Sequence, residues 1–386
     1  MMHDAERIAP RVAFLHPSRG PITERDWSGT PLGLVTAMRG LGVEVIEVGY
    51  KVPTLVRRLA HVVSRVISHD LTAAERSSIK IWLRRRTFQN QLDRLGHLDG
   101  VLAVGTDCYE LERLVVHAPV ATYDDTTLST MWESPESDTS NAGFRERDVR
   151  RWIETQARSA RAATVNCAST TWAARSIVSD YGVPSDRVVA VGMGHRPRTA
   201  GPVVARDWSV PVFLFVGVDW RRKNGEAVVR AFEAVRRVHR DATLHLVGRH
   251  APVSGPGIVD HGLLARDDPE AQNTLDNLLA RATAFVLPSR FDPSPIAYLE
   301  AASAGIPVIA TSEGGAGELL GEAAIVVSPF DDAALFNAML TLSGPEEARR
   351  RGELAKERAA ESTWEHVASR ILAALGVSAG ETERVQ

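Results

Sequence analysis

The sequence is poor in cysteine and lysine and has no long apolar run. Its two cysteines, Cys108 and Cys167, lie far apart in 386 residues and form no Cys-x-x-Cys motif. This excludes a disulfide framework and a zinc site built from thiolates, and it suits a reducing cytosol. No apolar stretch approaches the ~20 residues that span a bilayer, and the first residues hold no apolar run of signal-peptide length. We therefore expect a cytoplasmic protein.

An excess of one charge is missing as well. The chain has 45 Lys and Arg against 48 Asp and Glu, a formal net charge of -3, so no global basic field favours nucleic acid. Hydrophobic residues make up 44% and charged residues 24%, as in ordinary globular proteins, and the length corresponds to about two or three domains. Lysines are so few that each position is informative. They are Lys51, Lys80, Lys223 and Lys356.

Several catalytic motifs are also absent. The chain has no G-x-G-x-x-G, which argues against a dinucleotide oxidoreductase, and no G-x-x-x-x-G-K-[ST] of a P-loop NTPase. Residues 301–305 match the G-x-S-x-G motif of serine hydrolases only in part. No cluster of residues has metal-ligand spacing, so we expect neither a metal nor another cofactor.

Short apolar runs alternate with helical patterns along most of the chain. This alternation predicts an α/β protein with parallel sheets covered by helices. Strands are expected at Arg11–Leu15, Glu44–Val48, Val101–Val104, Val120–Tyr123, Ala163–Asn166, Val188–Val191, Val212–Val216, Leu244–Val247, Ala284–Leu287, Val308–Ala310 and Ala324–Val327. Helices are expected at Pro31–Arg39, Thr170–Tyr181, Glu226–His239, Asp332–Leu342 and Glu346–Ala360.

Residues 196–209 interrupt this alternation. They are rich in Pro, Arg and Gly, and we interpret them as a linker between two doubly wound domains, residues 1–195 and 210–362. Such sheets bind ligands at the carboxyl ends of their strands, so we expect a shared cleft there. Residues 363–375 are expected to form a helix, and the polar tail 376–386 is expected to be flexible.

The segment Pro288–Ser312 carries two carboxylates around a helix start. A strand runs into a loop with Asp292, and Ser294 and Pro295 fit the cap and the first position of the next helix. Glu300 follows about a turn and a half inside that helix. Carboxylates placed this way suit the capture of sugar hydroxyls, with helix amides nearby for anionic groups. A capping aspartate and a solvated glutamate are the alternative interpretation.

The segment Val212–Glu226 joins a buried strand to a helix through a basic loop. The strand ends at Gly217, and the loop carries Arg221, Arg222 and Lys223. Cations between a strand and a helix are well placed to neutralise a diphosphate. A solvated basic loop is the alternative.

Together the two segments resemble the C-terminal, nucleotide-sugar-binding domain of retaining glycosyltransferases of family 4, the group 1 class with the GT-B fold. That family has two carboxylates with seven residues between them, then a Gly and a Pro-Val, then a Gly-Gly before a Glu. The resemblance covers nearly all of residues 210–375. The matching residues are Asp292, Glu300-Ala301, Ala304–Val308, Gly314–Glu318, Gly217 with Arg222-Lys223, Leu244–Gly248 and Ser362–Trp364.

The resemblance implies two Rossmann-like domains that face each other across a cleft, with residues 363–375 crossing back to an N-terminal, acceptor-binding domain. It also implies a role for each matching residue of the donor site. Arg222 and Lys223 would hold the donor diphosphate, and Glu300 would bind the ribose hydroxyls. Asp292, with its neighbours Pro293, Ser294 and Pro295, would contact the transferred sugar. Gly248, Arg249 and Leu263 would cover the base.

The sequence departs from the family pattern at three places. The first carboxylate, Asp292, is shorter than the commoner Glu. Ser294-Pro295 stands where the family often has Phe-Gly, and Val218 stands where it often has Arg. These differences leave the identity of the sugar open.

The N-terminal half resembles the family more loosely. Gly29, within Trp27–Pro31, permits a phosphate to approach a helix N-terminus closely. Many members carry a catalytic histidine after the fourth strand, and counting places Asp125 there, next to Asp124. The alternative for these two residues is a simple capped turn.

The implied reaction moves a sugar from a UDP- or GDP-sugar to a hydroxyl of a small molecule, glycan or glycolipid, with retention of the anomeric configuration. The leaving diphosphate would receive the acceptor proton, so that the protein positions groups and stabilises charge without a metal. A nucleotide-sugar epimerase or phosphorylase of the same fold, or a non-catalytic sugar-nucleotide-binding protein, remain the alternatives.

Residues 51–88 differ from the rest in charge. They contain nine Lys and Arg against two acidic residues, a net charge of +7, and Val52 to Ile67 place their apolar residues on one helical face. Such a helix would make peripheral contact with the inner face of an anionic membrane. A helix packed on the core with a solvated basic face is the alternative.

Overall fold

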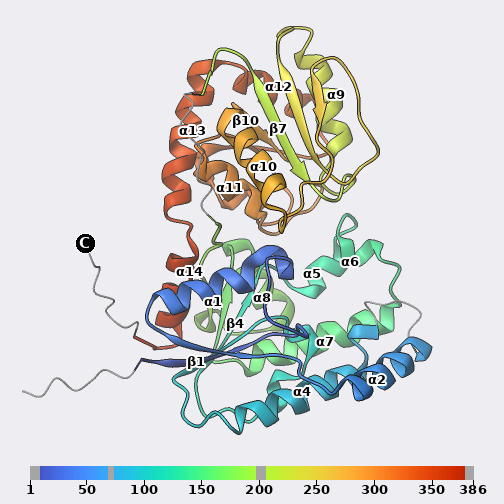
Figure 1. The fold of residues 1–386 in the computed structure, drawn as a ribbon, viewed down its shortest axis with the longest axis vertical. Coiled ribbons are helices and arrows are strands. Elements are labelled where there is room, and N and C mark those ends of the chain that lie inside the picture. The colour runs from blue at the N-terminus through green and yellow to red at the C-terminus, as the bar shows by residue number, and fades with distance from the viewer. Residues whose placement is uncertain (1–8, 68–73, 197–205, 379–386) are drawn as a thin grey trace, which may run out of the picture. The chain divides into compact units, whose positions relative to one another are not determined.

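The protein forms two compact units in the computed structural model, which describes residues 9–67, 74–196 and 206–378. Unit 1 comprises Met1–Pro135, Thr139–Gly192 and Trp364–Gln386, and unit 2 comprises Glu136–Asp138 and Met193–Thr363. Each unit is built around one parallel sheet with helices packed against it (Figure 1). Both show the α/β architecture that the alternation of strands and helices predicts.

Unit 1 contains a six-stranded sheet in the order β2-β1-β3-β4-β5-β6. Its strands are β1 Arg11–Leu15, β2 Glu44–Val48, β3 Gly100–Ala103, β4 Val120–Asp124, β5 Val165–Ala168 and β6 Val188–Ala190. Its helices are α1 Thr30–Gly40, α2 Thr54–Ile67, α4 Ser78–Leu92, α5 Leu128–Glu133, α7 Glu146–Ala162, α8 Thr171–Tyr181 and α14 Trp364–Ala374, with the short α6 Asp138–Asn141 at the unit boundary.

Unit 2 contains a second six-stranded sheet, in the order β12-β11-β10-β7-β8-β9. Its strands are β7 Val212–Gly217, β8 Thr243–Gly248, β9 Ile258–Asp260, β10 Ala284–Val286, β11 Val308–Thr311 and β12 Ala324–Val327. Its helices are α9 Gly225–Val235, α10 Pro269–Arg281, α11 Ile296–Ser303, α12 Asp332–Leu342 and α13 Pro345–Ala360.

The order of the strands determines where each sheet can bind a ligand. In unit 1 the chain direction across the sheet reverses between β1 and β3, and in unit 2 it reverses between β7 and β10. At such a point the loops leave neighbouring strands toward opposite faces, which opens a crevice at their carboxyl ends. The residues that follow β1, β3, β7 and β10 are therefore those most favourably placed to form sites.

The last helix of the chain returns to unit 1. α14 packs on α1 (Figure 1), and the contact depends on Gly33, whose missing side chain makes room for the Trp364 indole. A Cβ at Gly33 would lie 2.4 Å from Trp364 Nε1, so no other residue fits there without movement. This confirms the crossover that the resemblance implied.

Most expected strands appear within one residue of their predicted ends. β5 is an exception, because Ala163 ends α7 and the strand begins only at Val165. The three-residue β9 was not expected, since so short a run shows no periodicity. α9 ends at Val235, four residues before the predicted end.

The unit boundary falls between Gly192 and Met193, three residues before the predicted end of the first domain at 195. His195 already pairs with Thr363 in a parallel bridge, and its Nδ1 lies 2.6 Å from the Ser362 carbonyl, so it belongs to unit 2. Residues 197–205 of the predicted linker and 379–386 of the predicted tail lie outside the described residues.

α2 turns its apolar side outward. Its exposed side chains include Leu55, Val56, Leu59, Val62 and Val63. Its polar His61 is half-buried instead, with Nδ1 3.4 Å from Lys80 Nζ on α4. The described side chains therefore contradict a helix packed on the core through its apolar side. No helix in the described ranges is both long and apolar enough to cross a bilayer.

A buried ionic network lies between α2 and the sheet of unit 1. Glu75 Oε1 accepts a hydrogen bond from Lys80 at 2.7 Å, and Oε2 accepts one from Arg84 at 2.8 Å, while Arg19 also pairs with Glu75. Lys80 and Arg84 are 1% and 3% exposed, so their charges depend on this carboxylate. Burial raises the pKa of Glu75, but the hydrogen bonds from Lys80 and Arg19 outweigh it and lower the pKa from 4.5 to about 2.

We predict that Glu75→Gln destabilises the protein by about 3–5 kcal/mol near neutral pH, because it leaves two buried cations without their carboxylate. The pKa of Glu75 is lower in the folded state, so its contribution is present above pH 4.5 and is lost as the pH falls toward 2. Urea unfolding at several pH values measures both effects. Glu347→Gln is the control, because Glu347 also pairs with two arginines, Arg350 and Arg351, but both remain partly exposed to water, so that losing the carboxylate costs less. Equal stability of the two variants would contradict the prediction.

Candidate active site

The basic loop after β7 is held in place by two glycines. Lys223 lies across the end of the strand, where a Cβ on Gly217 would come within 2.9 Å of its side chain. Gly225 at the start of α9 makes room for the Trp220 ring in the same way. Asn224 adopts a left-handed conformation with φ 63°, and its Nδ2 donates to the Pro329 carbonyl at 2.7 Å. The local sequence thus fixes where Lys223 emerges.

Lys223 forms a buried ion pair with Asp292, which follows β10. The same carboxylate oxygen, Oδ2, accepts a hydrogen bond from Ser289 at 3.1 Å and lies 3.9 Å from Arg222 Nη1. Asp292 is 6% exposed. Burial lowers the pKa of Lys223, and Asp292 opposes this effect. The loops after β7 and β10 thus meet at the point where the strand order reverses.

A third loop positions Asp292 from the other side. Gly314 follows β11 with φ 86°, and a Cβ there would lie 2.3 Å from the Asp292 carbonyl oxygen. The Asp292 amide also donates to the Glu313 carbonyl at 3.3 Å. In the Gly314-Gly315 pair, the first glycine is therefore required by its close contact with the Asp292 backbone.

α11 carries the second carboxylate. Glu300 is buried and pairs with Arg266, with Nη1 and Oε1 3.5 Å apart. Tyr298 fixes the helix to the sheet, because its hydroxyl donates to the Leu287 carbonyl at 2.6 Å and accepts from the Thr311 amide at 3.0 Å. Glu300 is thus held on a rigid element.

The start of α11 differs from the prediction. The helix begins at Ile296, and Pro295 occupies the cap position with φ -71° and ψ 115°. Ser294 precedes the cap, so the assignment of Ser294 as cap and Pro295 as first helical residue was wrong by one position. Pro293 lies beside the Gly314 contact, with its nitrogen 3.2 Å from the position of a Gly314 Cβ.

The residues predicted to cover the base lie after β8 and β9. Gly248 has a packing role, because a Cβ there would lie 1.9 Å from the Gly217 carbonyl oxygen. Arg249 and Leu263 are exposed. The sequence reasoning did not single out His250, whose ring lies 4.4 Å from that of Trp220.

Unit 1 contains a cavity of about 370 Å³ at the carboxyl ends of its strands. It is lined by residues that follow β1, β3 and β4, together with residues from helices and from the loops before α1 and α4. These are His16, Pro17, Ser18, Asp26, Trp27, Pro31, Arg76, Val104, Gly105, Asp107, Cys108, Asp124, Asp125, Thr126, Leu128, Met131 and Gln156. Both predicted catalytic aspartates of this half therefore line one cavity.

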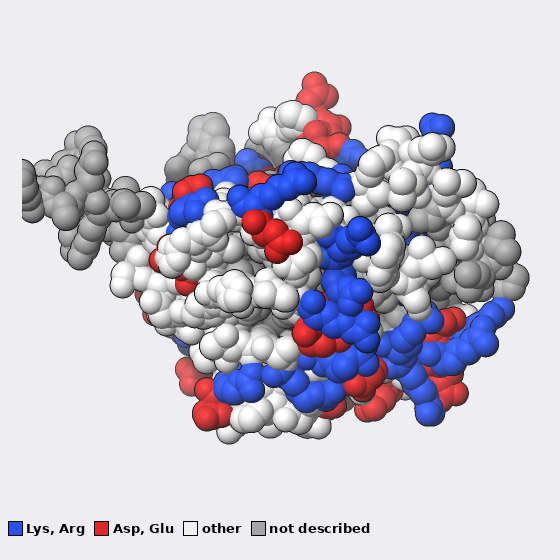
Figure 2. All heavy atoms as spheres, turned by 90° about the horizontal axis from the view of Figure 1, so that it is seen from below, with Lys and Arg blue, Asp and Glu red and all other residues white. Residues whose placement is uncertain are grey.

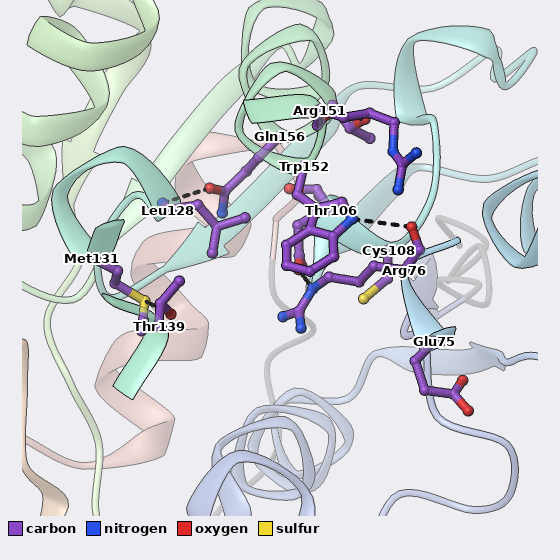
Figure 3. Close-up of polar contacts among 12 residues, drawn as sticks. Glu75, Arg76, Thr106, Cys108, Leu128, Met131, Thr139, Arg151, Trp152 and Gln156 are labelled. Atoms are coloured by element: carbon purple, nitrogen blue, oxygen red, sulfur yellow. Dashed lines mark hydrogen bonds and ion pairs between the residues drawn. The ribbon is translucent and has the colours of Figure 1, made fainter. Parts of the chain in front are cut away.

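Arg76 and Gln156 contribute polar groups to this cavity (Figure 3). The Arg76 guanidinium pairs with Asp107 and lies 5.3 Å from the centre of the Trp152 ring, while the Trp152 indole donates to the Arg76 carbonyl at 3.1 Å. Gln156 Oε1 accepts from the Leu128 amide at 2.9 Å. None of these residues was singled out from the sequence, because each contributes through tertiary packing.

Asp124 and Asp125 differ in their surroundings. Burial and the neighbouring Asp125 raise the pKa of Asp124 well above its usual value, which favours its protonated form. Asp125 Oδ2 accepts a hydrogen bond from Trp27 Nε1 at 3.3 Å, and the Trp27 ring lies 5.7 Å from that of Tyr123.

Gly29 ends a short left-handed stretch before α1. Trp27, Ser28 and Gly29 have φ values of 40°, 56° and 86°, a conformation that costs energy in the two non-glycine residues. The turn brings Trp27 against Asp125. Gly29 itself is the cap of α1 and is buried.

Within the described parts of the chain, no three His, Cys, Asp or Glu side chains gather as the ligands of a metal ion would. The structure thus brings Arg222, Lys223 and Asp292 together in unit 2, and Asp124 and Asp125 together in unit 1. Glu300, which lies on α11, pairs with Arg266.

Residues 210–344 match the family model of glycosyl transferases group 1. This part of unit 2 is thus similar to the group 1 glycosyltransferases. It contains all the residues that form the Lys223 and Asp292 cluster, and it contains Glu300.

Two curated relatives show similarity over part of their length. The chain is 31% identical over 191 residues to glycogen synthase of Mycobacterium tuberculosis (strain ATCC 25618 / H37Rv). The aligned part covers 45% of this chain and 42% of that protein. It is 30% identical over 244 residues to MMP alpha-(1->4)-mannosyltransferase of Mycolicibacterium hassiacum, 58% of this chain and 57% of that one. The chain thus spans about half the length of the curated relatives it matches.

Solved structures share the fold of the whole chain. Sucrose-phosphate synthase from Thermosynechococcus elongatus aligns with a TM-score of 0.66 at 16% identity, over 94% of this chain and 97% of that one. WaaG, a glycosyltransferase involved in lipopolysaccharide biosynthesis, aligns with a TM-score of 0.63 at 16% identity, over 96% and 100%. The two six-stranded parallel sheets and the returning α14 are the GT-B fold of the glycosyltransferases.

We predict that Gly314→Ala displaces the Asp292 loop and weakens nucleotide binding at least about tenfold, because the new Cβ collides with backbone. Gly321→Ala is the matched control. Gly321 also has a positive φ of 53°, but no atom lies within 4 Å of its Cβ position, so only the roughly 1–2 kcal/mol of left-handed strain applies. Calorimetric titration with UDP and GDP compares the variants. If both bind like the wild-type protein, the loop contact does not organise this site.

Proposed function

We propose that the protein transfers a sugar from a UDP- or GDP-sugar to a hydroxyl group of an acceptor, with retention of the anomeric configuration. The observation that carries the proposal is the cluster of partly buried Lys223 and Arg222 with buried Asp292 at the reversal point of the unit 2 sheet, within the part that matches the group 1 glycosyltransferases. Phosphorylated or sugar ligands bind at this place in doubly wound sheets.

The donor roles follow from charge and position. Lys223 and Arg222 supply positive charge for the diphosphate, Lys as a compact charge and Arg as a planar donor. Asp292 balances Lys223 in the free protein, and its second oxygen is suited to a sugar hydroxyl. Glu300, fixed on α11 and paired with Arg266, accepts hydrogen bonds from ribose hydroxyls. Gly248, Arg249 and Leu263 border the base.

The cavity of unit 1 provides the acceptor site in this proposal. Asp125 accepts a hydrogen bond from Trp27 and stabilises positive charge that develops on the sugar, while Asp124, with its raised pKa, donates a hydrogen bond from its protonated form. The leaving diphosphate takes the acceptor proton. Gly29 borders the phosphates, and no metal takes part.

An epimerase or phosphorylase would use the same donor cluster. The cavity of about 370 Å³ favours a transferase, because it offers room for an acceptor and has carboxylates at its wall, Asp124 and Asp125 among them. The acceptor is a small molecule, a glycan or a glycolipid. Peripheral contact with the inner face of a membrane through residues 51–88 is part of the same proposal.

We predict that Lys223→Ala and Glu300→Gln each weaken donor binding or turnover at least about tenfold without unfolding the protein. A thermal-shift and hydrolysis screen across UDP-, GDP- and dTDP-sugars identifies the donor first, and titration of each variant follows. Arg230→Ala is the control, because Arg230 is an exposed α9 residue paired with exposed Asp332. The proposal fails if no nucleotide sugar stabilises the protein or is turned over. Wild-type kinetics in both variants would refute the site.

We further predict that Asp125→Ala lowers turnover about a hundredfold while leaving nucleotide binding within about twofold, because Asp125 belongs to unit 1 and acts on the reacting sugar. Turnover is followed by release of the nucleoside diphosphate. Asp186→Ala, at an exposed residue of the same unit, is the control. Unchanged turnover in Asp125→Ala would remove this residue from the mechanism.

A further inference from the structure

The exposed side of α2 is a continuous apolar strip. Leu55, Leu59 and Val62 are 71%, 61% and 60% exposed, and their spacing of four and three residues places them on one helical face. Val56 and Val63 border this strip and are also exposed. Most helices of a water-surrounded domain bury such a face, so this one is suited to a surface outside the chain.

A polar side chain lies on the inner side of α2, among the residues that the structure describes. His61 is half-buried and lies against Lys80 of α4, which is itself buried on Glu75. Among the described side chains of α2, the contact of His61 with α4 is thus polar, and the exposed apolar strip is directed away from it. This orientation is the reverse of that of a helix that helps to build a core.

The charges around the strip select the kind of surface. Four basic residues of the segment are engaged with carboxylates, namely Arg76, Lys80, Arg84 and Arg85. Three other basic residues are exposed: Lys51 before α2, Arg58 on α2 and Arg86 on α4. The Arg86 guanidinium lies 5.6 Å from the ring centre of the exposed Trp82. Figure 2, which views the molecule from below, shows Lys and Arg gathered beside areas of uncharged side chains.

Exposed apolar side chains on a helix that also exposes a cation match the interface of an anionic lipid leaflet. Lipid tails take the apolar strip, and phosphate headgroups take the cations. A protein partner of opposite charge would need acidic groups around an apolar groove, whereas a leaflet offers both at any position. The charge pattern thus favours the lipid surface.

We propose that α2 is a membrane-docking helix that lies in the plane of an anionic leaflet, with Leu55, Leu59 and Val62 inserted and Lys51 and Arg58 at the phosphates. This inference rests on the membrane contact of the proposed function and names the residues that make it. Glu75, which binds Lys80, directly precedes Arg76 of the cavity wall, and the two side chains point to opposite sides (Figure 3).

Cosedimentation of the full chain with vesicles tests the proposal. We expect binding to vesicles of phosphatidylcholine with phosphatidylglycerol, and little binding to phosphatidylcholine alone. Leu59→Glu should lower the partition coefficient at least about tenfold, since it places a charge in the inserted strip. Arg58→Gln should lower it about fivefold, and added salt should weaken the binding of the wild-type protein.

Val238→Glu is the matched control. Val238 is 61% exposed like Leu59 but lies in unit 2, so the same change of charge and polarity should leave vesicle binding unchanged. The midpoint of thermal unfolding checks that each variant is folded, and binding of UDP and GDP checks the donor site separately. Loss of nucleotide binding would therefore concern the proposed function and not the docking.

Three results would overturn the docking proposal. The first is no binding to either vesicle, and the second is equal binding to both, which would remove the electrostatic part. The third is a dimer of the wild-type protein in light scattering that Leu59→Glu converts to a monomer without any vesicle binding, because the strip would then be covered by a second copy.

Discussion

Lys223 and Asp292 form a buried ion pair on which the geometry of unit 2 depends. Removing two charges from water is costly, so the pair persists only where the surrounding backbone fixes both partners. Three glycines provide that backbone: Gly217 makes room for the lysine stem, Gly248 allows the strand ends to approach, and Gly314 lets the next loop press on Asp292. The pair can form at all because β7 and β10 are neighbours in the sheet although β8 and β9 lie between them in the chain. An arriving diphosphate would meet a lysine that is already desolvated, which strengthens their attraction.

The same topological constraint places the cavity of unit 1. β1 and β3 are neighbours at the reversal point of that sheet, and the residues after them, with those after β4, supply most of the cavity wall. Here the charged groups of the wall are mostly carboxylates, and its single arginine, Arg76, is paired with Asp107. The two units thus use one architectural rule for different chemistry. Cations gather where phosphates are expected, and carboxylates gather where hydroxyl groups and developing positive charge are expected.

Much of this was accessible from the sequence, because its signals are local. Apolar runs of three to five residues marked the strands of both sheets except β9, and β1, β2 and β12 have the predicted ends. Asp292, Glu300 and Lys223 stood out because they lie at strand-to-helix loops. What the sequence did not show depends on contacts between distant segments. Ser289 and Arg266 bind the two carboxylates from positions without a pattern of their own, and the cap of α11 shifted by one residue because Pro295 can precede a helix as well as begin it.

The basic segment shows why periodicity alone cannot orient a helix. The sequence of α2 defines an apolar side and a polar side, but either side could face the sheet. The choice is made by Glu75, since Lys80 and Arg84 are buried only because this carboxylate neutralises them, and Lys80 then offers His61 a polar surface. The net charge of +7 of residues 51–88 therefore overstates the positive charge at the surface, because Arg76, Lys80, Arg84 and Arg85 are paired with carboxylates of unit 1. The apolar strip is exposed while the lysine is buried, so one carboxylate links the stability of unit 1 to the orientation of the helix that we propose docks on a membrane.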